Sequence, residues 1–106
     1  MPKFLMEVSY TAEGAKGLLK DGGTKRRAAA EALVKSVGGT IESMYFTFGS
    51  RDAIVISDLP DTTAAAAAGI ALAASGAVTS RTTLLITPAE IDAAVKKTAS
   101  YTPPGR

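Results

Sequence analysis

The sequence predicts a single α+β domain of the ferredoxin-like type, a four-stranded antiparallel sheet with its helices on one face. Its 106 residues, 46% of them apolar and 21% charged, suffice for one domain with a buried core but not for two. The periodic patterns follow the order strand, helix pair, strand, strand, helix, strand, helix, which contains the β-α-β unit twice, as this fold requires. We expect this domain to span residues 1–99 and residues 100–106 to form a C-terminal tail.

The first strand is followed by two short helices. Apolar and more polar residues alternate over residues 4–10, which is the period of a strand. One helix is expected over residues 12–20. A second is expected over residues 25–37, where apolar positions recur at helical spacing. Gly22 and Gly23 lie between the two helices and predict a stop and a bend.

Two strands come next and should form a hairpin. Period-two alternation covers residues 40–48 and places Met44 and Ile41 on opposite faces. Residues 49–50, glycine and serine, are typical of a tight two-residue turn. The β-branched residues in the range 53–59 then predict a third strand, antiparallel to the second.

An alanine-rich helix, a fourth strand and a last helix complete the pattern. Asp61 is expected to cap the helix over residues 62–75, whose many alanines would let its backbone approach a neighbour closely. Residues 77–86 predict the fourth strand. Residues 87–90 combine a capping box with proline at the first helical position, which predicts a helix to about residue 99.

The sheet face without helices decides whether the chain can exist as a monomer. If the alternation holds, this bare face carries Leu5, Glu7, Ser9, Tyr45, Thr47, Ala53, Val55, Ser57, Thr79, Arg81, Thr83 and Leu85. Such a face is too apolar for open water, and packing against a copy of itself would cover it. We therefore expect a homodimer or a larger homo-oligomer, with room for a pocket between the two sheets.

Several function classes are excluded by the residues that the chain lacks. It has no cysteine, which excludes thiolate metal sites and thiol nucleophiles, and no histidine, which excludes Ser-His-Asp catalysis. The net charge is only +2 and the basic residues are scattered, so nucleic-acid binding is not expected. No apolar run reaches the roughly 20 residues that span a bilayer, and no signal peptide is apparent. We expect a cytoplasmic protein without membrane contact, metal or cofactor.

Three stretches carry a resemblance to a known family. They are YFTFGSRDAIVI and DLPD at residues 45–56 and 58–61, LLKDGGTKRR at residues 18–27 and SGAVTSRTTLL at residues 75–85. Together they resemble the GYD-domain family over nearly the whole chain. The resemblance implies a ferredoxin-like fold of the dimeric α/β-barrel type and brings no established substrate or reaction. Arg51 stands where the family's name leads one to expect tyrosine, so no role of that tyrosine is carried over.

The candidate ligand-binding residues are Arg81, Tyr45, Asp52, Tyr10 and Arg26. Arg81 should face away from the helices, where an arginine needs a carboxylate partner or a bound anion. Tyr10 and Tyr45 can line a cavity on the bare face with hydroxyl donors beside apolar walls. Arg26 lies on the apolar stripe of its helix, where it either clamps an anion or covers apolar surface with its stem. Asp52 is either a base or ligand in a cleft or a structural turn residue.

Three functions remain open at this point. The first is an oligomeric binding module, whose intersheet cavity, lined by Tyr45, Arg81 and Asp52, takes a small organic anion. The second is a cofactor-independent enzyme of the dimeric α/β-barrel type, an oxygenase or isomerase, for which fold analogy is the only warrant and no catalytic residue is assigned. The third is a purely structural oligomer subunit. The binding module is the function that the sequence favours.

Overall fold

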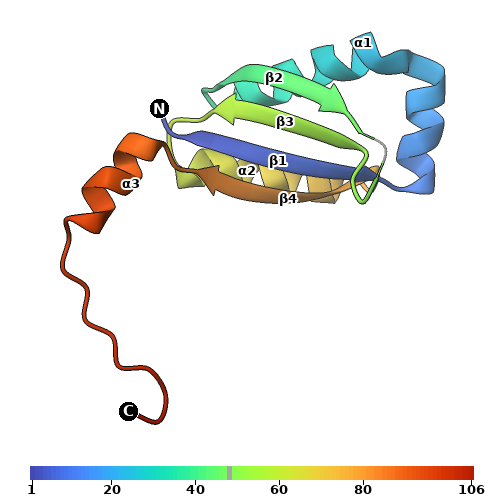
Figure 1. Ribbon diagram of the computed structural model, residues 1–106. Helices are drawn as coiled ribbons and strands as arrows, with labels where there is room; N and C mark the ends of the chain where they lie inside the picture. The colour runs from blue at the N-terminus through green and yellow to red at the C-terminus, as the bar shows by residue number, and fades with distance from the viewer. Residues whose placement is uncertain (48) are drawn as a thin grey trace.

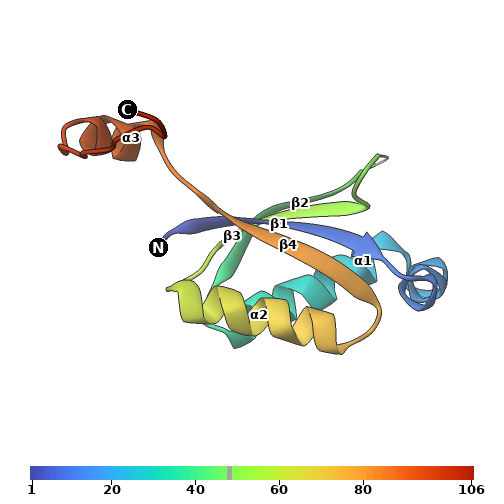
Figure 2. The ribbon, with the colours of Figure 1, turned by 90° about the horizontal axis from the view of Figure 1, so that it is seen from below.

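Four strands form one antiparallel sheet, and two long helices cover one of its faces. The computed structural model describes residues 1–47 and 49–106. Its elements are β1 (Lys3–Tyr10), α1 (Ala12–Ser36), β2 (Thr40–Phe46), β3 (Ala53–Asp58), α2 (Thr62–Ala74), β4 (Val78–Leu85) and α3 (Pro88–Val95). The sheet order is β2-β3-β1-β4, and each neighbouring pair is antiparallel. With α1 and α2 on the same face (Figures 1 and 2), this is the ferredoxin-like fold that the sequence predicts.

The core lies between the sheet and these two helices. Its buried residues are Phe4 and Met6 of β1, Val34 of α1, Val55 of β3, Leu59, and Ala64, Ala65 and Ala68 of α2. Each fully buried residue that α2 contributes is an alanine, so the backbone of that helix can lie close to the sheet. Asp61 caps α2 as predicted, because its side chain accepts a hydrogen bond from the backbone N–H of Ala64 at 2.8 Å.

Helix α1 bends at the predicted position. Gly22 has φ 76° and ψ 174°, a conformation outside the helical region that glycine adopts without steric cost. The two helices expected on either side of this glycine are therefore the two halves of α1, which turns a corner in Figure 1. The bend allows the second half of α1 to lie along the sheet.

The start of α1 is fastened to the loop that precedes β4. The Thr11 backbone N–H donates to the carbonyl of Ala77 at 2.9 Å, and the Thr11 hydroxyl donates to the carbonyl of Gly76 at 2.8 Å. One turn later, a Cβ at Gly14 would lie 1.9 Å from the Ala77 oxygen, so only glycine fits there. These contacts join the first β-α-β unit (β1, α1 and β2), at the start of α1, to the second unit (β3, α2 and β4), at the loop before β4.

The predicted face of the third strand is wrong. Ala53, Val55 and Ser57 are buried under the helices, and Ile54 and Ile56 lie on the bare face instead. The register decides this, because Val55 pairs with Met6 of β1, which points into the core. Both alternating sets in β3 are mostly apolar, so hydrophobicity alone does not distinguish its two faces.

The second strand contains a β-bulge that the period-two reading missed. The pairing with β3 shifts between Ile41 and Ser43, so that Ile41 and Met44 both pack against the core. The expectation that Ile41 shares a face with Tyr45 is therefore wrong, because an inserted residue reverses the alternation. The predicted end of this strand at Phe48 lies outside the described residues.

One connection and one helix differ from their predicted lengths. Strand β2 ends at Phe46 and β3 begins at Ala53, so the connection is longer than a two-residue turn; the Thr47 N–H donates to the Asp52 carbonyl at 2.9 Å. Helix α3 ends at Val95 and not near residue 99. All of α3 is exposed, so no packing extends it beyond its capped first turns.

Candidate functional site

A cleft opens between α1 and α2, with the sheet as its floor. Its volume is about 390 Å³. The lining residues are Met6, Val8, Tyr10, Arg26, Ala29, Ala30, Leu33, Val34, Met44, Ala53, Val55, Ala71, Leu72, Ser75, Ala77 and Val78. The walls are apolar, and alanines on both helices leave the space that larger side chains would fill. Arg26 is the one cation among these residues, and Tyr10 and Ser75 supply hydroxyl groups.

Arg26 is placed at this cleft by the helical stripe that it shares with Ala30 and Leu33, as its spacing predicts. Its Nη1 lies 3.7 Å from the Asp21 Oδ2, which is beyond hydrogen-bond length. The Arg26 side chain is 37% exposed. Arg26 therefore lines the cleft and holds only a loose ion pair across the bend of α1.

Arg27, the next residue, makes a different contact. Its Nε lies 3.1 Å from the Glu31 Oε1 on the outer surface of α1, the solvated i, i+4 pair typical of an exposed helix face. Arg27 does not line the cleft. The two neighbouring arginines thus separate into one that faces the cleft and one that faces solvent.

Asp52 has a structural role. Its carboxylate accepts the Tyr10 backbone N–H at 2.7 Å, and its own N–H donates to the Val8 carbonyl at 2.9 Å. These bonds extend the pairing with β1 to the residue before Ala53, the first residue of β3. Tyr10 itself points to the helix side, with Val8, so the expectation that Tyr10 and Tyr45 share the bare face is wrong. The register places them on opposite faces of the sheet.

The bare face carries one cross-strand row that joins two of the candidates. Tyr45 pairs with Ile54, Ile54 with Glu7, and Glu7 with Arg81, so these residues cross β2, β3, β1 and β4 in order. Arg81 faces away from the helices, as predicted. Tyr45 and Arg81 lie at opposite ends of the row, about 14 Å apart at the usual strand spacing. Within one chain they do not converge on a ligand.

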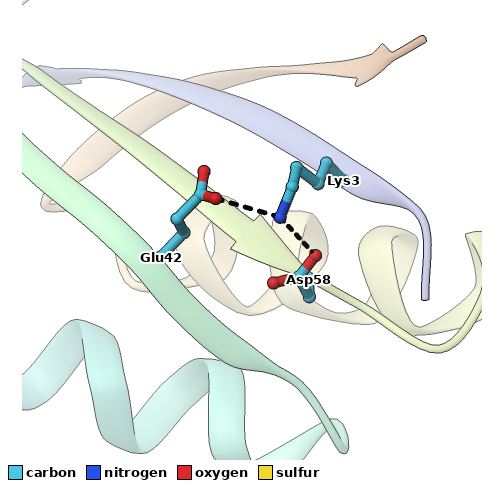
Figure 3. Close-up of polar contacts among 3 residues, drawn as sticks. All are labelled: Lys3, Glu42 and Asp58. Carbon is cyan, nitrogen blue, oxygen red and sulfur yellow. Dashed lines mark hydrogen bonds and ion pairs between the residues drawn. The ribbon is translucent and has the colours of Figure 1, made fainter. Parts of the chain in front are cut away.

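Leu5, Ile54 and Ile56 form the apolar centre of this face, and charged residues frame it. Near one end, the Arg51 Nε lies 3.9 Å from the Glu7 Oε2. At the other end, the Lys3 Nζ lies 2.8 Å from the Asp58 Oδ1 and 3.1 Å from the Glu42 Oε1 (Figure 3). Hydrogen bonds to Asp58 and Glu42 raise the pKa of Lys3 above its ordinary 10.5, so this contribution to stability is lost only as the pH rises past that value.

Two further classes of site are absent from the described residues. In residues 1–47 and 49–106, no group of three or more His, Cys, Asp or Glu side chains is placed to hold a metal ion. No helix in the same part of the chain is both long enough and apolar enough to cross a membrane.

Comparison with known proteins identifies the family. The profile of the GYD domain matches residues 4–95, which contain every helix and strand of the described residues apart from Lys3 at the start of β1. The chain belongs to the GYD-domain family. No curated protein and no solved structure gives a significant match.

In this GYD domain, the arginine that departs from the expected tyrosine has a partner. Arg51 lies in the β2–β3 connection and pairs with Glu7 on the bare face, so its charge is part of the frame around the apolar centre. A tyrosine at this position would leave Glu7 without that cation. The departure therefore bears on the sheet surface and not on the cleft.

The GYD domain thus holds its candidates in two places. Tyr10 and Arg26 meet at the cleft, whereas Tyr45 and Arg81 lie on the bare face, and Asp52 belongs to the backbone hydrogen bonding. The sequence did not indicate that the alanines of α2 would leave a cleft open. It also missed the Lys3, Glu42 and Asp58 cluster, because these residues come together only through the strand register.

Proposed function

We propose that this GYD domain is an oligomeric module that binds a small organic anion in the cleft between α1 and α2. The observation that carries the proposal is the position of Arg26, a cation with only a loose protein partner, at an otherwise apolar cleft. The cleft falls within the range of about 300–1,000 Å³ that small-molecule sites occupy. It replaces the intersheet cavity as our preferred site.

The chemistry of the lining defines the ligand class. A guanidinium recognises a carboxylate through two parallel N–H···O bonds, while the methyl groups of Ala29 and Ala30 and the side chain of Leu33 favour an apolar body. The Tyr10 hydroxyl and the Ser75 hydroxyl add hydrogen-bonding groups at the margin. We infer a monocarboxylate with an aliphatic or aromatic tail, bound without chemical conversion.

The test uses octanoate and its uncharged counterpart octanol as probes, with binding followed by NMR titration of the amide signals. Arg26→Gln should weaken octanoate binding about tenfold or more and leave octanol binding nearly unchanged, because a charge-assisted bond is lost. Arg27→Gln is the matched control, since it removes the same charge from the outer face of the same helix. It should leave both affinities unchanged.

Two more variants locate the site. Ala30→Phe should weaken both probes, because the added ring fills the cleft, and its circular dichroism spectrum checks that the fold is retained. Arg81→Gln should have no effect, because Arg81 lies on the opposite face of the sheet. Loss of octanoate binding in Arg81→Gln but not in Arg26→Gln would place the ligand between two sheets and overturn the assignment to the cleft.

Self-association through the bare face is the second part of the proposal. Leu5, Ile54 and Ile56 form an apolar centre, and both charge signs are present at either end of it. An apolar centre within a polar rim is the usual anatomy of a protein interface. A second copy related by a two-fold axis would cover the centre and supply opposite charges to the rim. This supports a homodimer of the α/β-barrel type.

A further inference from the structure

The C-terminal arm, residues 86–106, stands clear of the rest of the molecule. Every residue of α3 is exposed, and Figures 1 and 2 show the helix and the segment after it projecting beyond the end of β4. Large apolar side chains are exposed along it: Ile86 (55%), Ile91 (48%), Val95 (76%) and Tyr101 (78%). This is an unusual density of exposed apolar surface for a short segment.

The arm nevertheless contains a well-defined helix. Thr87 and Glu90 form a complete capping box, and Pro88 lies at the first helical position. Ile91 and Val95 are four residues apart, so they lie on the same side of α3 and form an apolar stripe. Eight residues are too few for a stable isolated helix in water, so α3 needs a surface on which this stripe can pack.

The direction of the arm indicates which surface this is. Helix α3 lies on the side of the sheet opposite α1 and α2 (Figure 2), which is the side of the bare face. A second copy packed on the bare face would lie on that same side. The arm is therefore continuous with the proposed interface, and it points away from the core of its own chain.

The area of the bare face supports the same partner. Four strands of six to eight residues cover a plane of roughly 20 by 24 Å, or about 480 Å². A standard interface buries about 800 Å² on each partner. The accessible surface of the side chains on this face is larger than the plane itself, so the face supplies a large part of such an interface, and an apolar helix from each chain would add to it.

We propose that the C-terminal arm is exchanged between two copies of this chain, so that Ile91 and Val95 of each α3 pack against the other copy. The partner is a second GYD domain, and the contact is reciprocal because a two-fold interface uses the same residues twice. This inference rests on the self-association proposed above and is independent of the ligand proposed for the cleft.

Mixed-label NMR tests the exchange directly. The chain has no cysteine, so Lys97→Cys provides a single site for a nitroxide spin label just beyond α3. Two samples are mixed and equilibrated. One carries the spin label and no ¹⁵N, and the other carries ¹⁵N and no spin label. Broadened amide signals in the ¹⁵N chains are expected, because the label lies on the other copy. Unbroadened signals in a sample shown to be dimeric would overturn the exchange and favour an arm that stays with its own chain.

A matched pair of variants tests the apolar stripe by sedimentation equilibrium. Ile91→Asp should raise the dimer dissociation constant about tenfold or more, because it places a charge in the packed stripe. Ala93→Asp adds the same charge on the opposite side of α3 and should leave the constant nearly unchanged. Equal constants for the two variants would overturn the proposal. A wild-type chain that is monomeric would overturn both the exchange and the self-association, whereas octanoate binding would be unaffected.

Discussion

At the residue scale, Gly14 is the glycine with the least room for a side chain. A Cβ there would lie 1.9 Å from the Ala77 carbonyl oxygen and 2.9 Å from its carbon. Both atoms belong to the backbone and cannot rotate away. We expect Gly14→Ala to lower the free energy of unfolding by about 1–3 kcal/mol or more, because the start of α1 must move off the loop before β4. Urea denaturation followed by circular dichroism measures the change.

Gly17 provides the control for this prediction. It lies one turn further along the same helix and has no atom near the position of an added Cβ. Gly17→Ala should stabilise the protein by about 0.5–1 kcal/mol, because alanine is the better helix former. Similar effects of the two substitutions would show that the contact between Gly14 and Ala77 does not limit the side chain at this position.

Single residues were predictable from the sequence where their own helix determined their position. The helical spacing of Arg26 with Ala30 and Leu33 predicted that Arg26 lies on the apolar side of α1, and all three residues line the cleft. The roles of Tyr10 and Asp52 depend on a contact between residues 42 positions apart. No local pattern encodes such a contact, so their relation became visible only in the folded chain.

At the element scale, the capping box of α3 predicts a pH response. The Thr87 backbone N–H donates to the Glu90 carboxylate at 3.0 Å, and this bond holds the pKa of Glu90 below its ordinary 4.5. A lowered pKa means that the stabilisation is present above 4.5 and is lost as the pH falls through the lowered value. We expect the helical Cα shifts of Ile91 and Val95 to decrease as the pH falls from about 6 to about 2.

The variant Glu90→Gln separates this titration from other effects of acid. Glutamine can accept the same hydrogen bond but does not titrate, so the part of the pH dependence of the α3 shifts that comes from Glu90 should be absent from this variant. The Cδ signal of Glu90 in the wild-type chain should also titrate with a midpoint below 4.5. A midpoint at or above that value would contradict the capping geometry.

Helices and strands could be predicted where capping residues or glycines marked their ends and the hydrophobic period agreed. The faces of β2 and β3 could not be predicted in full from these signals. Thr11, Asp61 and Thr87 begin their helices as expected, because each has a side chain that accepts a hydrogen bond from the first turn. The face of β3 was wrong because both of its alternating sets are apolar. The bulge after Ile41 was missed because the residues on either side of an inserted residue still alternate. The insertion only exchanges the positions that face the core with those that face away from it.

At the scale of the whole molecule, the shape of the chain is extended. The radius of gyration is 16.8 Å, whereas a compact domain of this length has about 13 Å. The C-terminal arm contributes to this value, because it projects away from the sheet and its two covering helices. The fold class could be inferred from the order of elements, but the arm could not, because its capping pattern predicts a helix without saying where that helix lies.

The bare face yields a prediction at this same scale. Ile54→Asp should shift the protein from dimer to monomer at micromolar concentration, because Ile54 lies in the apolar centre of the face and outside the core. Leu19→Asp is the control, since Leu19 is 88% exposed on α1, remote from this face. Light scattering coupled to size-exclusion chromatography measures the mass. A dimer that persists in Ile54→Asp would place the interface elsewhere.

The bulge in β2 has a consequence for how this protein resists misassembly. The sheet order leaves β2 and β4 as its two outer strands, each with a row of backbone groups that another strand could pair with. On β2 the shift between Ile41 and Ser43 interrupts that row, whereas β4 pairs with β1 without interruption from Val78 to Leu85. Amyloid-like growth by strand addition would therefore begin on β4, where Arg81 is the sole charge opposing it.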